Sequence, residues 1–219
     1  MMASIYHYAK NVNIWLGTAT NDSAMGIEIL SYLATNNDAA STPPRVSYPQ
    51  CLVRAGLSCI MNRDWFRRIW VVQEAAVSKK ATMICGHHQF SWTNNYLLVR
   101  RIERMVKFAE ISPQWEQAGL GTVDMSPLLD LLDLQIGQHM DRLHGSSHRP
   151  SRDLLDVAHG LREKASTDPR DKIFSVVGCA ISPEVDDFVV DYNMTVMETY
   201  NHLRDVVQLS YQISDRLSH

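Results

Sequence analysis

The sequence lacks the features that most often reveal a membrane or nucleic-acid function. No apolar run approaches the length of a membrane-spanning helix, and the N-terminus has no signal-peptide pattern. The 21 Lys and Arg residues do not outnumber the 24 Asp and Glu residues, so the formal net charge is −3. Proteins that bind nucleic acids or anionic membranes in a general way usually carry a basic excess. We therefore expect no nucleic-acid partner, no membrane partner and a cytoplasmic location.

Recognised metal and nucleotide motifs are also missing. There is no CxxC pair, HExxH, Walker loop, GxGxxG or GxSxG in the chain. Two groups of possible ligands are the run Cys85-Gly86-His87-His88 and the set His139, Asp141, His144 and His148. Neither has the spacing of a zinc site, and Gly86 favours a hairpin tip. We expect no metal and no resident cofactor, with Cys51, Cys59, Cys85 and Cys179 as reduced thiols.

What the sequence does contain is enough apolar residues for a core. It has 219 residues, of which 45% are hydrophobic, and helical periodicity dominates. Helices are expected over residues 2–10, 22–34, 50–61, 65–79, 96–109, 128–140, 151–164, 168–177 and 195–209. Short strands are expected over residues 12–16, 81–85 and 89–92, the last two as a hairpin around Gly86. Residues 36–49 and 143–150 are expected to be loops, and 112–125 to be irregular.

The predicted helix over residues 65–79 places an aromatic ring beside a carboxylate. Asp64 is a plausible cap, Trp70 and Glu74 lie one turn apart, and Arg67 lies two turns before Glu74. Such a pair suits a cationic planar ligand or an oxocarbenium-like transition state at a ribose carbon. The simpler interpretation makes Trp70 a core residue and Glu74 the partner of an arginine, and spacing alone favours it.

Three motifs, in their order along the chain, resemble the fungal heterokaryon-incompatibility (HET) domain family. They are MASIYHYAKNVNIWLG at residues 2–17, NRDWFRRIWVVQE at 62–74 and STDPRDKIFSVVGC at 166–179. The first fits the family pattern M-x-x-I-Y-x-x-A-x-x-V-x-x-W-L-G, which includes Trp15 and Gly17. The second fits W-x-x-R-x-W-x-x-Q-E through Trp65, Arg68, Trp70, Gln73 and Glu74. A further family block is similar to residues 190–200.

The resemblance implies a fold and a possible chemistry. The HET domain is similar to the TIR domain, a flavodoxin-like α/β unit, and some TIR domains cleave NAD with a glutamate in a W-x-x-x-E context. Trp70 and Glu74 match that context. By resemblance, Glu74 would be the catalytic residue that contacts the ribose and Trp70 a wall for the nicotinamide. Arg67 is the other predicted ligand-binding residue, and NAD would be a substrate.

The remaining motif residues are predicted to be structural. Trp15, Gly17, Trp65, Arg68 and Gln73 would belong to the scaffold. In the downstream motif, Asp168 can cap a helix that Pro169 starts, since proline fits the first helical position. Arg170 and Asp171 could then form salt bridges to another element.

Two motifs that open full HET domains, L-S-Y-x-W-G and W-I-D-A-x-C-I-N-Q, do not occur in the sequence. We therefore expect residues 1–92 to be the C-terminal part of a HET domain whose first strands are missing. Residues 93–219 would form a helical extension. The expected fold class is a helix-rich α/β protein with a partial TIR-like parallel sheet, whose missing strands would leave apolar edges exposed.

The resemblance also predicts a function. A HET-type module would act in heterokaryon incompatibility, which is non-self recognition leading to programmed cell death, a form of innate immunity. It would act through self-association or through a protein partner. The alternatives are a TIR-like NAD glycohydrolase that uses Glu74 and a non-functional family fragment.

Overall fold

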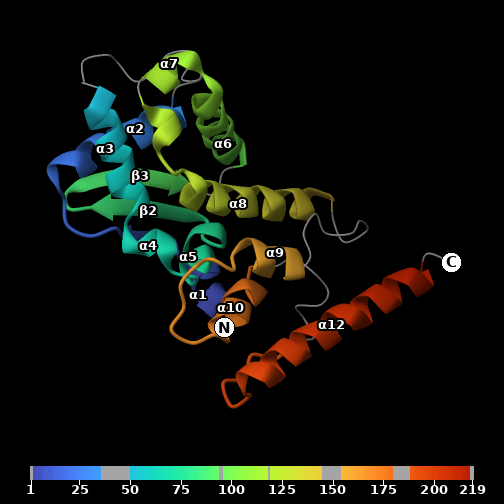
Figure 1. Ribbon diagram of the computed structural model, residues 1–219. Helices are drawn as coiled ribbons and strands as arrows, with labels where there is room; N and C mark the ends of the chain where they lie inside the picture. The colour runs from blue at the N-terminus through green and yellow to red at the C-terminus, as the bar shows by residue number, and fades with distance from the viewer. Residues whose placement is uncertain are drawn as a thin grey trace.

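The computed structural model describes residues 2–35, 50–93, 96–117, 119–144, 154–179 and 188–217. The strands are β1 (Val12–Trp15), β2 (Lys80–Cys85) and β3 (His88–Thr93). The helices that precede β2 in the chain are α1 (Met2–Tyr8), α2 (Asn21–Thr35), α3 (Gln50–Met61), α4 (Asp64–Arg67) and α5 (Val71–Ala76). The helices that follow β3 are α6 (Tyr96–Ile111), α7 (Pro113–Gln117), η1 (Leu120–Thr122), α8 (Ser126–His144), α9 (Leu154–Gly160), α10 (Asp171–Val177) and α12 (Val196–Leu217). The fold is thus helix-rich α/β, as predicted (Figure 1). The expected loop at 36–49, and most of the one at 143–150, lie outside the described residues.

The three strands form one mixed sheet in the order β1-β2-β3. Strand β1 runs parallel to β2, with Val12 beside Ala81 and Trp15 beside Ile84. Strands β2 and β3 form the expected antiparallel hairpin. Among the described residues the sheet therefore contains a single parallel pair, rather than a parallel array.

Two glycines join the hairpin tip to the end of β1. Gly86 has φ +57° and Gly17 has φ +103°, conformations that side-chain-bearing residues rarely adopt. The Gly86 N–H donates to the Gly17 carbonyl at 2.9 Å, and a Cβ on Gly86 would lie 2.5 Å from that of Ala19. Both glycines are therefore required by backbone geometry.

One face of the sheet is buried and the other is open. Along β1 and the next residue, Val12, Ile14 and Leu16 are buried, whereas Asn13 and Trp15 are exposed. This alternation follows from the two-residue period of a strand. Helix α2 packs against β2 and β3, and α3 packs against α2. Parallel strands are usually covered on both faces, so the open face is unusual for the β1–β2 pair.

The helix predicted over residues 65–79 is instead two short helices, α4 and α5. Between them Arg68 is extended, with φ −79° and ψ 138°. The reason is a tertiary pairing with a distant segment: Ile69 N–H donates to the Ala165 carbonyl at 2.9 Å, and Ala165 N–H to the Arg67 carbonyl at 2.6 Å. The predicted cap at Asp64 is also wrong, because Arg63 is the N-cap residue and makes no side-chain cap bond.

Helix α2 begins one residue before the predicted bound of 22, at Asn21, and is capped by Thr20 and Ser23. Thr20 precedes the helix, and its Oγ1 accepts the Ser23 N–H at 3.2 Å. The Ser23 hydroxyl oxygen in turn accepts the Thr20 N–H at 2.8 Å. This is a reciprocal capping arrangement with serine in place of the usual Glu or Gln.

A single cluster of buried apolar residues extends along the chain from Val12 to Val207. The cluster includes residues on both sides of position 92. The boundary expected there, between a HET part and a helical extension, stays a prediction. Helix α12 begins beside α10, and its C-terminal end points away from the other helices and strands (Figure 1). Within the described part of the chain, no helix combines the length and apolarity needed to cross a lipid bilayer.

Candidate functional site

The second motif places Glu74 at the centre of a small polar cluster. Glu74 is half-buried on α5, and its Oε2 accepts a hydrogen bond from the Trp65 indole N–H at 2.8 Å. The Tyr6 hydroxyl donates to the same carboxylate. These three side chains come from α1, α4 and α5, so the carboxylate connects the N-terminal helix to the motif.

Burial raises the pKa of Tyr6, and the negative charge of Glu74 and the hydrogen bond to it act in the same direction. The nearby positive charge of Arg68 acts in the opposite direction. Tyr6 therefore stays protonated at neutral pH and remains a donor to Glu74. Sequence reasoning listed Tyr6 only as a motif residue, because nothing in its spacing connects it to a carboxylate 68 positions away.

Trp70 and Arg67, the other two residues predicted to bind a ligand, lie outside this cluster. Trp70 is the N-cap residue of α5, half-buried and packed against the core. Arg67 is exposed and belongs to α4, so the break at Arg68 removes it from the helical face that carries Glu74. The structure thus brings Trp65 and Tyr6, rather than Trp70 and Arg67, to the carboxylate.

The Gln73 side chain points into the interior. Its Nε2 donates to the Ser175 carbonyl at 2.7 Å, with the Phe174 carbonyl at 3.5 Å. The Gln73 Oε1 and the Ser175 hydroxyl are buried with no hydrogen-bond partner. This contact connects α5 to α10, where the downstream motif lies.

Lys164 makes a second connection between a distant segment and the motif at residues 62–74. Sequence reasoning did not identify this residue. Its side chain is 7% exposed, its Nζ donates to the Phe66 carbonyl at 3.0 Å, and Asp130 Oδ2 lies 3.5 Å away. Burial lowers the pKa of Lys164, and it raises the pKa of Asp130 despite the opposing effect of the lysine. Lys172 Nζ also donates to the Lys164 carbonyl, which holds the backbone of this segment in place.

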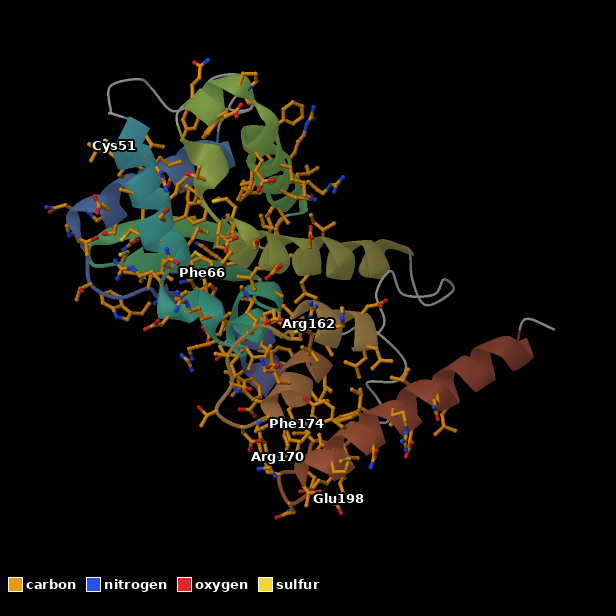
Figure 2. All side chains as sticks on the ribbon, viewed as in Figure 1. Cys51, Phe66, Arg162, Arg170, Phe174 and Glu198 are labelled. Atoms are coloured by element: carbon orange, nitrogen blue, oxygen red, sulfur yellow. The ribbon has the colours of Figure 1, made fainter. Side chains whose placement is uncertain are left out.

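The downstream motif forms a clamp on the segment that leads into α12. Arg170 pairs with Asp168 at 2.6 Å and donates to the carbonyls of Tyr192 and Met194, each at 2.7 Å. The Tyr192 hydroxyl donates to Asp171 Oδ1 at 2.7 Å. Figure 2 shows Arg170 in the region where α10 meets the start of α12, close to Glu198.

The hydrogen bonds from Arg170 lower the pKa of Asp168, and the bond to Asp168 raises the pKa of Arg170. Asp168 Oδ1 accepts the Arg170 backbone N–H at 2.9 Å, but α10 begins only at Asp171. Pro169 therefore lies in the turn before the helix, rather than at its first position as predicted.

The first motif is less buried than its apolar spacing suggests. Ile5 and Tyr8 on α1 are 69% and 80% exposed, whereas Tyr6 is half-buried. Trp15 is 57% exposed on the open face of the sheet. Gly17 serves the backbone turn described above.

Among the described residues, no group of three or more His, Cys, Asp or Glu side chains could hold a metal ion. Cys85 is buried and its Sγ lies 3.7 Å from the Thr18 carbonyl, while His87 and His88 pack against each other. Of the second predicted group, His139, Asp141 and His144 belong to α8 and His148 lies outside the described residues.

Comparison with known proteins identifies one family. Residues 1–74 match the sequence model of the family described as Heterokaryon incompatibility protein (HET). The matched range contains the first two motifs and ends at Glu74, whereas the downstream motif lies outside it. No curated protein and no solved structure matches the chain. Over residues 1–74 the chain is therefore similar to the heterokaryon incompatibility family, the family that its first two motifs resemble.

Proposed function

We propose that this protein is a HET-type module of non-self recognition that triggers programmed cell death through contacts with another protein or with a second copy of itself. The observation that carries the proposal is the family match over residues 1–74. We place this action in the cytoplasm.

The contacts around the second motif support a module larger than the matched segment. Lys164, Ala165 and Ser175 all bind atoms of residues 66–73. These contacts are buried or are backbone pairings, and a buried polar group that loses its partner is strongly destabilising. We therefore propose that the part of the chain up to α10 acts with the HET segment as one body.

The test is inducible expression of the chain in a fungal host, with viability followed by dye exclusion at matched protein abundance. We expect cell death with the wild-type chain and survival with Phe66→Asp, which places a charge at a site that is 1% exposed and should unfold the protein. Equal survival with the wild-type chain and with empty vector would contradict the proposal and would favour a non-functional family member.

A second candidate function is NAD cleavage, with NAD as substrate. It assumes that the parallel pair β1–β2 is the remnant of a TIR-like sheet. One observation favours it: the half-buried Glu74 carboxylate is held in a fixed position by Trp65 and Tyr6, as a residue that contacts a ribose must be. The same two bonds have a structural role, which makes this the weaker candidate.

NAD consumption by the purified chain tests this candidate. If Glu74 is catalytic, Glu74→Gln abolishes turnover, because the amide cannot stabilise a positive charge developing on the ribose. Tyr6→Phe is the matched control, since it removes one bond to Glu74 but keeps the carboxylate. Turnover that is absent from the folded wild-type chain, or equal in Glu74→Gln, would exclude the glycohydrolase function.

A further inference from the structure

Strand β1 lies at one edge of the sheet, and its outer side pairs with no strand among the described residues. The Leu16 N–H donates to the Ile84 carbonyl of β2 at 2.8 Å. Because backbone groups of alternate residues point to opposite sides of a strand, Val12, Ile14 and Leu16 face β2. The N–H and C=O groups of Asn13 and Trp15 therefore point outward, away from the sheet.

This edge lacks the usual protection against pairing with another strand. Native edge strands commonly carry charged residues, proline or a bulge. Residues 11–17, NVNIWLG, contain no charge and no proline, and the register with β2 runs without a bulge. Asn13 and Trp15 are also exposed.

We propose that β1 pairs with β1 of a second copy of this chain, in antiparallel orientation about a two-fold axis through Ile14. In this register Asn13 of each copy lies opposite Trp15 of the other. The outward N–H and C=O groups of both residues then form four hydrogen bonds, two at each rung. The two sheets become one continuous six-stranded sheet.

The side chains fit this register as well as the backbone does. Residues opposite each other across an antiparallel pair point to the same face, so both copies present Asn13 and Trp15 on the open face. The two Trp15 side chains then lie on the diagonal, at roughly 7–8 Å between backbone positions, which aromatic rings can span. Because the strand is uncharged, a second copy meets no electrostatic repulsion. An extended peptide of another sequence would use the same backbone groups but would lack this tryptophan pair.

The test is sedimentation velocity of the purified full chain over a concentration series. We expect a reversible monomer–dimer equilibrium for the wild type. Asn13→Pro removes the outward N–H and hence two of the four bonds, but none of the bonds between β1 and β2. We expect it to weaken dimerisation at least tenfold while the far-UV circular dichroism stays unchanged.

Two matched controls separate the backbone from other effects. Asn13→Ala keeps the N–H but loses the side-chain bond between Asn11 and Asn13, and should keep most of the dimer. Ser91→Pro makes the same change on β3, whose outward N–H lies at the other edge, and should leave the dimer intact. If Asn13→Pro fails to fold, Trp15→Gln decides, since this exposed side chain can be replaced without opening the core.

A wild-type chain that stays monomeric at all concentrations overturns the inference, as does a dimer that Asn13→Pro or, where needed, Trp15→Gln does not weaken. The proposed function requires contact with another protein or a second copy, and this inference names the second copy. Only that link rests on the proposed function. The two can fail separately. A dimer that depends on Asn13 but causes no cell death supports the pairing and contradicts the function, whereas cell death caused by a strictly monomeric chain does the reverse.

Discussion

Lys164 and Arg170 make the same kind of contact at different degrees of burial. Each is a cation that donates to backbone carbonyls of a distant segment and has a carboxylate beside it. Lys164 binds the Phe66 carbonyl in the interior, with its side chain 7% exposed. Arg170 binds the carbonyls of Tyr192 and Met194 nearer the surface, with its side chain 22% exposed.

The difference lies in what happens when either contact is broken. A buried carbonyl or carboxylate that loses a cation cannot be fully rehydrated, so the loss is large. At the surface water and ions replace the lost partner, so the loss is small. The HET segment is therefore held to residues 161–179 by contacts that resist change. The start of α12 is held by a clamp that solvent and salt can weaken.

The largest effect is expected for Lys164→Met, which keeps the volume of the side chain but removes its charge. The Phe66 carbonyl then has no donor and Asp130 no cation. We expect the free energy of unfolding to fall by about 3 kcal/mol, near the lower end for a broken buried pair because Asp130 is partly exposed. Urea denaturation measures this change.

Arg204→Met is the matched control, because this exposed arginine pairs with the exposed Asp205 on α12. It should change the free energy of unfolding by about 0.5 kcal/mol or less. A loss below about 1 kcal/mol for Lys164→Met would show that the buried contact is no stronger than a surface pair.

The pH dependence sharpens the same prediction. Because burial lowers the pKa of Lys164 below its ordinary 10.5, the unfolded chain binds more protons than the folded chain between the lowered value and 10.5. The contribution of Lys164 to stability therefore rises with pH through this window. Lys164→Met lacks this group, so its deficit should widen as the pH rises toward 10.5.

A smaller effect is expected for Gln73→Leu, which is similar in volume and changes one neutral hydrogen bond. The Ser175 carbonyl loses its donor, but the unpaired Oε1 of Gln73 is removed as well. We expect a loss of about 1–2 kcal/mol in the free energy of unfolding. Gln89→Leu, an exposed position on β3, should change it by about 0.5 kcal/mol or less. A stabilised Gln73→Leu variant would mean that the unpaired oxygen outweighs the bond.

The features predicted from the sequence are those with local causes. Helix α3 has the predicted bounds because Val53, Leu57 and Ile60 repeat at helical spacing along one side. The hairpin was predicted from a glycine between two short apolar runs, and Gly86 has the positive φ that this turn needs. The first two HET motifs, which lie within the family match, could also be recognised because they are short and continuous.

The features that sequence reasoning missed have distant causes. The helical period of residues 65–79 is unbroken, and only the pairing of Arg68 with Ala165 interrupts the helix. Lys164 has no local signal either, since its partners Phe66 and Asp130 lie far away along the chain. Trp15 was assigned to the scaffold because of its motif, and the open face of the sheet is a property of the whole fold.

The smallest effect is expected for Asp168→Asn, which weakens the surface clamp but keeps the contacts of Arg170 to the two carbonyls. The bonds from Arg170 lower the pKa of Asp168 below its ordinary 3.8, so the clamp contributes stability above that value and loses it as the pH falls through the lowered pKa. The melting temperatures of the wild type and Asp168→Asn should therefore differ slightly at neutral pH and converge in acid.

The melting temperatures of the wild type and Asp168→Asn should also converge in about 1 M NaCl, where exposed charges are screened over roughly 3 Å. The deficit of Lys164→Met should persist at the same salt concentration, because buried pairs are screened much less. If high salt removed both deficits equally, the distinction between the buried and the exposed contact would be wrong.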